Sequence, residues 1–144
     1  MLMLSDVKKT LVISHSELAL DVLLERKPHV ENASCLLVKV ETGEIVGYLC
    51  ATTVTTLDYL MQKALGKAHA KVLVKKLLQL FEISPVNRLV LEGALDSEMV
   101  DFEDSVLHES ALHTSLDGIV TRDKTGYKQA KLPVYTPQEL LILL

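Results

Sequence analysis

Short apolar runs alternate with longer amphipathic stretches along the whole chain. The apolar runs have the length of strands and predict strands at residues 10–14, 47–50, 82–84, 118–121 and 134–135. Between these runs, apolar residues recur every three or four positions, which predicts helices. Strands that alternate with helices form a parallel sheet covered on both faces. The pattern therefore predicts one α/β domain over residues 1–144, a three-layer α/β/α sandwich around a central parallel sheet.

The residues before several predicted helices are typical helix caps. Ser16 and the pair Thr52–Thr53 are expected to cap the helices that follow them. Thr136, Pro137 and Glu139 have the spacing of a capping box with proline at the first helical position. These signals place the helix starts directly after the predicted strands.

Composition narrows the function classes. Hydrophobic residues make up 49% of the 144 residues and aromatic residues only 4%, so the core is expected to be aliphatic. The formal net charge of −4 argues against a basic surface built for nucleic-acid backbones. Such binding would need a local patch, a bridging metal or a second subunit. The densest basic stretch, expected mainly as solvated helix surface, contains Lys63, Lys67, Lys71, Lys75 and Lys76.

The two cysteines and the apolar segments bear on the cellular compartment. Cys35 and Cys50 lack metal-ligand spacing and are expected to be buried free thiols, as in a reducing compartment. No apolar run reaches the roughly 18 residues of a membrane span. A cytoplasmic protein without a membrane segment is the expectation.

Acidic residues mark the candidate site. Asp101, Asp104 and His108 are spaced to share one face of a helix. Asp123 follows a β-branched run at the end of a predicted strand, where open α/β sheets bind ligands. Carboxylates that converge without basic partners repel one another, and a hard divalent cation such as Mg²⁺ or Mn²⁺ relieves that repulsion. A metal site is therefore the leading hypothesis.

Four segments in sequence order resemble the PIN domain family, most closely its stand-alone forms related to VapC toxins. The segments are residues 20–28, 47–57, 101–104 and 119–123. The resemblance implies a Rossmann-like fold and a Mg²⁺- or Mn²⁺-dependent endoribonuclease that cleaves single-stranded RNA with a metal-activated water. It also implies a homodimer and, for toxins, an antitoxin partner.

The resemblance assigns roles to four residues by their position in the motifs. Asp104 and Asp123 match family acids that hold the metal, Asp101 is an additional carboxylate, and Thr121 supplies a hydroxyl beside the site. Glu17 lies two residues after the first acidic position of the family pattern. Its carboxylate is expected to reach the metal and complete the ligand shell.

Two positions depart from the family pattern. His15 stands at the first acidic position, with Glu17 at the position of the companion Asn. Thr56 stands near the second acidic position, with Asp58 beyond it. Because a neutral imidazole is a softer donor than a carboxylate, Mn²⁺ would suit this site better than Mg²⁺.

Each candidate also has an ordinary structural interpretation. Asp101 is equally well explained as a helix N-cap, and Asp104 as an acid favoured by the helix dipole. His15 is more often a hydrogen-bonded edge residue than a ligand, and packing explains His108 as well as a site role does. Arg122 is expected to pair with nearby carboxylates when no metal is present.

Two hypotheses for the function remain open. The first is a metal-dependent endoribonuclease with Asp104, Asp123 and Glu17 in catalysis and Asp101 in the ligand shell. The second is a degenerate PIN-like module that binds nucleic acid or protein without cleavage, because its first metal ligand is missing. A phospho-acceptor receiver domain also alternates strands and helices, but the segment at residues 83–85 lacks the aspartate which that class requires.

Overall fold

Five parallel strands form the central sheet of the computed structural model, which describes residues 10–144. Their order in the sheet is β3-β2-β1-β4-β5, and each neighbouring pair is parallel. The strands span Thr10–Ser14 (β1), Ile45–Cys50 (β2), Glu82–Ser84 (β3), Gly118–Val120 (β4) and Val134–Tyr135 (β5). The predicted parallel sheet is confirmed.

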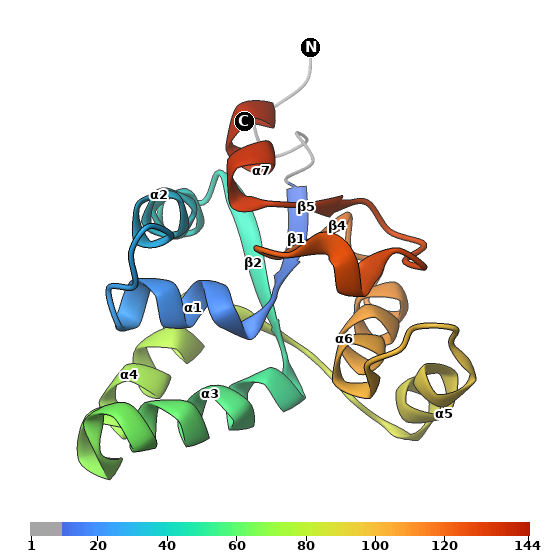
Figure 1. Cartoon of the computed structure of the whole chain (residues 1–144), viewed down its shortest axis with the longest axis horizontal. Coiled ribbons are helices and arrows are strands. Elements are labelled where there is room, and N and C mark those ends of the chain that lie inside the picture. The colour runs from blue at the N-terminus through green and yellow to red at the C-terminus, as the bar shows by residue number, and fades with distance from the viewer. Residues whose placement is uncertain (1–9) are drawn as a thin grey trace.

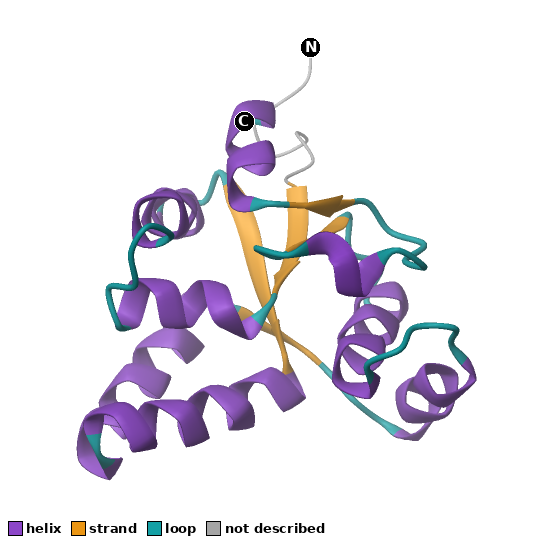
Figure 2. Cartoon of the chain, viewed as in Figure 1, coloured by secondary structure: helices purple, strands orange, loops and turns teal. Residues whose placement is uncertain are grey.

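Seven α-helices cover the two faces of this sheet (Figure 1). They span Ser16–Leu23 (α1), Val30–Glu41 (α2), Ala51–Leu65 (α3), Lys67–Leu80 (α4), Arg88–Asp96 (α5), Phe102–His113 (α6) and Pro137–Leu143 (α7). A short 3₁₀ helix, η2, spans Lys124–Tyr127 between β4 and β5. Figure 2 shows the orange strands between two groups of helices, with α5 and α6 on one side and α1 to α4 on the other. This is the predicted α/β/α arrangement.

Alternating side chains of the central strands fill the two halves of the core. Ile13 and Ile119 are fully buried in the cluster that includes residues of α5 and α6. Val12 and Val120, one position away, pack with residues of α1, α2 and α7 on the other face. Both faces of a covered parallel sheet must be apolar, which explains why the strands read as continuous hydrophobic runs.

The helix ends confirm one predicted cap and correct two others. The capping box of α7 is present as predicted, with Thr136 and Glu139 bonded reciprocally. The cap of α1 is His15 rather than Ser16, because the imidazole accepts the Glu17 N–H. Helix α3 begins at Ala51, so Thr52 and Thr53 lie inside its first turn.

Two expectations about the surface and the compartment can be compared with the structure. Cys50 is buried as predicted, whereas Cys35 is exposed, because it lies on the outer side of α2 next to the buried Leu36. Within residues 10–144, no helix has both the length and the hydropathy that crossing a membrane requires.

Candidate functional site

Three loops bring the candidate site together where the parallel strands end. β1 ends at Ser14 and His15 follows, while β4 ends at Val120 and leads through Asp123 into η2. Because β1 and β4 are neighbours in the sheet, these two strand ends lie side by side. The start of α6 supplies Asp104 to the same place.

His15 is held at both ring nitrogens. Its Nδ1 accepts the Glu17 N–H at 3.3 Å, and its Nε2 lies 3.4 Å from Asp104 Oδ1. A neutral ring whose Nδ1 is an acceptor must carry its proton on Nε2, the nitrogen that lies near the carboxylate. Burial opposes protonation of the ring, but the hydrogen bond and the charge of Asp104 outweigh it and raise the pKa of His15.

Asp104 receives a second donor from η2. Tyr127 Oη donates to Asp104 Oδ1 at 3.1 Å, and the Tyr127 ring stands edge-on to His15. Burial and the adjacent Asp104 raise the pKa of Tyr127, so its hydroxyl keeps its proton. Gly126 leaves room for this contact, since a Cβ there would lie 2.9 Å from Asp104 Oδ2. Together, His15, Asp104 and Tyr127 form the His15–Asp104–Tyr127 cluster.

The other two aspartates predicted to bind a metal instead cap the helices that follow them. Asp101 is the N-cap of α6 and accepts the Asp104 N–H at 2.9 Å. Asp123 caps η2 by accepting the N–H and hydroxyl of Thr125, and these bonds lower the pKa of Asp123. Thr121 is buried, and its hydroxyl bonds to the backbone of Asp123.

Glu17 belongs to a network of two arginines and two acids. Arg122 Nη2 donates to Glu17 Oε2 at 2.7 Å, and Arg122 Nε lies 3.3 Å from Asp21 Oδ2. Arg26 Nε donates to Asp21 Oδ1 at 2.9 Å. Arg122 therefore pairs with carboxylates, although the sequence interpretation did not name Asp21 as a partner. A charge as deeply buried as Asp21 requires such pairing.

The remaining candidates have other neighbours. His108 is buried, and its Nε2 accepts the Lys131 N–H at 2.9 Å, while burial lowers its pKa. Thr56 donates to Glu103 at 3.0 Å, across from α3 to α6. Asp58 accepts a hydrogen bond from Gln62 on the same helix.

The donor set does not fit a bound Mg²⁺ or Mn²⁺ in this arrangement. Within residues 10–144, no group of three or more His, Cys, Asp or Glu side chains is placed to hold an ion. The structure brings His15 to Asp104, but the imidazole presents an N–H donor there instead of a lone pair. Glu17 is paired with Arg122, and Asp123 is bonded to Thr125.

Comparison with protein families decides the classification. A model described as the PIN domain matches residues 15–125, which is well over half of the chain. The chain belongs to the PIN domain family. PIN domains are generally metal-dependent, whereas residues 10–144 of this chain present no group of side chains placed to hold a metal. No curated protein matches the chain.

Solved structures agree with this membership at the level of fold. FitAcB from Neisseria gonorrhoeae superposes with a TM-score of 0.67 at 22% identity, covering 88% of this chain and 98% of that one. DNA-bound VapBC from Salmonella typhimurium gives 0.68 at 10% identity, covering 90% and 99%. VapC20 from Mycobacterium tuberculosis, a toxin that cleaves the sarcin–ricin loop, gives 0.62 at 11% identity, covering 79% and 91%. The chain thus has the fold of VapC and FitB toxins.

The sequence interpretation missed two residues of the site region. Tyr127 lies in a turn without periodicity, so no pattern marked it. Asp21 carried a usable signal, because an acid among the apolar residues of α1 requires a cationic partner, and Arg26 follows five residues later.

Proposed function

We propose that this protein is a PIN-fold module that binds single-stranded RNA where its parallel strands end, without a divalent ion held among its acids. The observation that carries the proposal is the pairing of His15 with Asp104. The pKa of His15 is raised above its ordinary value, so the ring holds a proton up to a higher pH than a free imidazole does, and a protonated ring attracts phosphate. The same charge disfavours a metal cation beside Asp104.

A Mg²⁺- or Mn²⁺-dependent endoribonuclease of the toxin type is the second candidate. One observation favours it: within the described residues, Oδ2 of Asp104 and Oδ2 of Asp123 accept no hydrogen bond. These two oxygens are the donors that hard cations prefer. In that function Asp104, Asp123 and Glu17 would act in catalysis, with Asp101 in the ligand shell.

RNA binding and cleavage by the full chain discriminate between the two candidates. We expect the wild-type protein to bind a labelled single-stranded RNA in the presence of EDTA and to leave it intact across Mg²⁺ and Mn²⁺ titrations. A His15→Asp variant is expected to gain cleavage, because it restores an acid beside Asp104. His15→Asn is the matched control, since it also provides an N-cap but adds no charge. Cleavage by the wild type that Asp104→Asn abolishes would establish the second candidate instead.

Protein partners of the toxin–antitoxin kind are part of this proposal. The similar structure from Klebsiella pneumoniae is a toxin–antitoxin complex. FitAB and VapBC were both solved bound to DNA. A homodimer stays a prediction for this chain. Ile142 and Leu143, 78% and 65% exposed at the end of α7, are apolar residues that a second subunit would cover.

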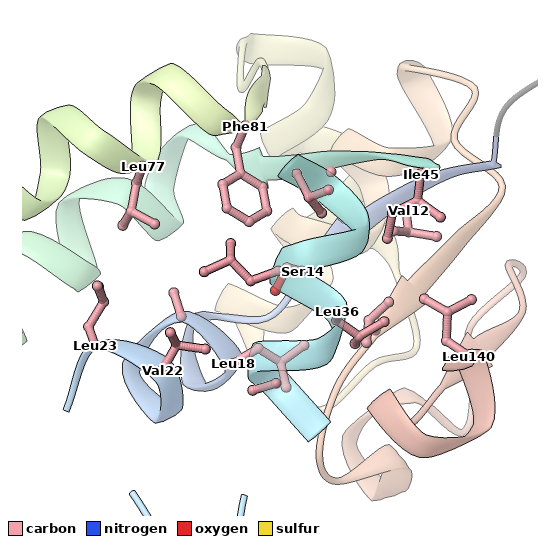
Figure 3. Close-up of a pocket in the computed structure, with 16 residues that line it drawn as sticks. Val12, Ser14, Leu18, Val22, Leu23, Leu36, Ile45, Leu77, Phe81 and Leu140 are labelled. Carbon is pink, nitrogen blue, oxygen red and sulfur yellow. The ribbon is translucent and has the colours of Figure 1, made fainter. Parts of the chain in front are cut away.

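An apolar cavity of about 50 Å³ lies on the other side of the β1 end (Figure 3). Residues of α1, α2 and α4 line it together with β1 and β2, and the Ser14 hydroxyl is a polar group among aliphatic side chains and Phe81. Because no ionisable side chain lines this cavity, we assign RNA binding to the polar surface around His15 and Arg122 instead.

A further inference from the structure

A polar pocket of about 370 Å³ lies beside the candidate site, between the starts of α2 and α7. Its polar lining comes from Asp21, His29, Asn32, Arg122, Thr136 and Gln138. Arg122 connects the pocket to the site, because its Nη2 also bonds to Glu17 in the first turn of α1, two residues after His15. The volume falls in the range of small-molecule pockets.

Three of the lining side chains have unused hydrogen-bonding groups. His29, Asn32 and Gln138 make no side-chain hydrogen bond to any residue within 10–144. The two carboxamides offer both donors and acceptors, which is the combination found on the edges of nucleobases. A phosphate or a metal ion would use only one half of that set.

The charged groups of the pocket are already fixed. Asp21 is 0% exposed and is flanked by Arg26 and Arg122, so the orientation of Arg122 is set before a ligand arrives. Asp21 Oδ2 and Arg122 Nε are buried and lie 3.3 Å from each other as an ion pair. Both residues line the pocket, so a ligand there meets charged groups whose positions are already set.

We propose that this pocket binds one nucleobase of a single-stranded RNA whose backbone passes the His15–Asp104–Tyr127 cluster. This inference rests on the proposed RNA binding and adds a base-specific subsite to it. The Asn32 and Gln138 carboxamides hydrogen-bond to the base edge. The Arg122 guanidinium provides a plane for the base to stack on, as guanidinium planes do in other RNA sites, and the exposed Pro28 ring adds an apolar contact.

Titration of the full ¹⁵N-labelled chain with each of the four nucleosides tests the subsite directly. The side-chain amide resonances of Asn32 and Gln138 report on the pocket, and free nucleosides carry no phosphate. We expect saturable shifts of both resonances, with one nucleoside preferred. Asn32→Ala and Gln138→Ala should each lower the affinity for that nucleoside about tenfold, as expected for loss of a base-edge contact. Gln79→Ala is the matched control, because Gln79 is exposed on α4, away from the pocket.

Three results would overturn the subsite. The first is the absence of shifts at Asn32 and Gln138 with all four nucleosides. The second is the same set of shifts with inorganic phosphate alone, which would show an anion site at Arg122. If RNA binds but the Asn32→Ala and Gln138→Ala variants retain wild-type affinity and base preference, the subsite is wrong and the proposed function stands. If the wild type binds no RNA, the proposed function itself is wrong.

Discussion

Tyr127 Oη donates a hydrogen bond of 3.1 Å to Asp104 Oδ1, and this contact ties the turn after β4 to the first turn of α6. The same oxygen faces His15 Nε2. Asp104 thereby has a hydrogen-bond donor from one loop and a close imidazole from another, so the cluster stabilises the arrangement of the loops as well as the charge of the carboxylate.

Removing the Tyr127 hydroxyl should destabilise the fold. In Tyr127→Phe, the ring still fills its buried position, but Asp104 loses a donor. We expect the free energy of unfolding to fall by about 1 to 2 kcal/mol, less than the upper range for a charged acceptor because the Asp104 side chain is 19% exposed. Urea unfolding measures this change. Tyr59→Phe is the control, because Tyr59 is 58% exposed and should tolerate the loss of its hydroxyl.

The His15–Asp104 pair should make stability depend on pH. The pKa of His15 is raised in the folded protein above its ordinary value of 6.5. The pair therefore stabilises the fold fully below the unfolded pKa, and this stabilisation is lost as pH rises through the folded pKa. Urea unfolding from about pH 5 to about pH 8 measures the free energy of unfolding of both proteins. The difference between wild type and His15→Gln should become smaller as pH increases. A gap that is constant over this range would show that His15 acts only as a helix cap.

The elements that sequence patterns predicted well are those specified by neighbouring residues. The strand at Thr10–Ser14 is a continuous apolar run, and the box at Thr136 and Glu139 is complete within four residues. Both depend on interactions between residues close in the chain. The structure has both features where the sequence placed them.

The site was less predictable because its contacts join distant segments. The acidic residues were expected to hold a metal, with a helix N-cap as an equal alternative for Asp101. In the structure Asp101 caps α6 and Asp123 caps η2. Which role an aspartate takes depends on the distance to acids elsewhere in the chain, and a local pattern does not contain that distance. Glu17 pairs with Arg122, which lies 105 residues later.

Neutralising Asp21 should lower the free energy of unfolding more than neutralising a surface acid does. Asp21→Asn keeps the shape of the side chain but leaves Arg26 and Arg122 without their shared counter-charge. We expect the free energy of unfolding to fall by about 2 to 3 kcal/mol. This is less than the usual effect of breaking a buried ion pair, because both arginines are partly exposed. Chemical denaturation measures it, with the exposed Asp96→Asn as control. Equal stability of the two variants would show that Asp21 contributes no net stabilising charge.

Adding a side chain at Gly126 should disturb the cluster without unfolding the domain. A Cβ at this position would lie 2.9 Å from Asp104 Oδ2, and the carboxylate can rotate away because it is the end of a flexible side chain. In Gly126→Ala we therefore expect Asp104 to move from His15, and the pKa of His15 to fall because burial then meets less opposition. NMR titration of the His15 ring measures this change, with the exposed Gln129→Ala as control. If Gly126→Ala leaves the pKa of His15 at its wild-type value, Asp104 keeps its position despite the added methyl group, and the close approach of Gly126 is not required for the cluster.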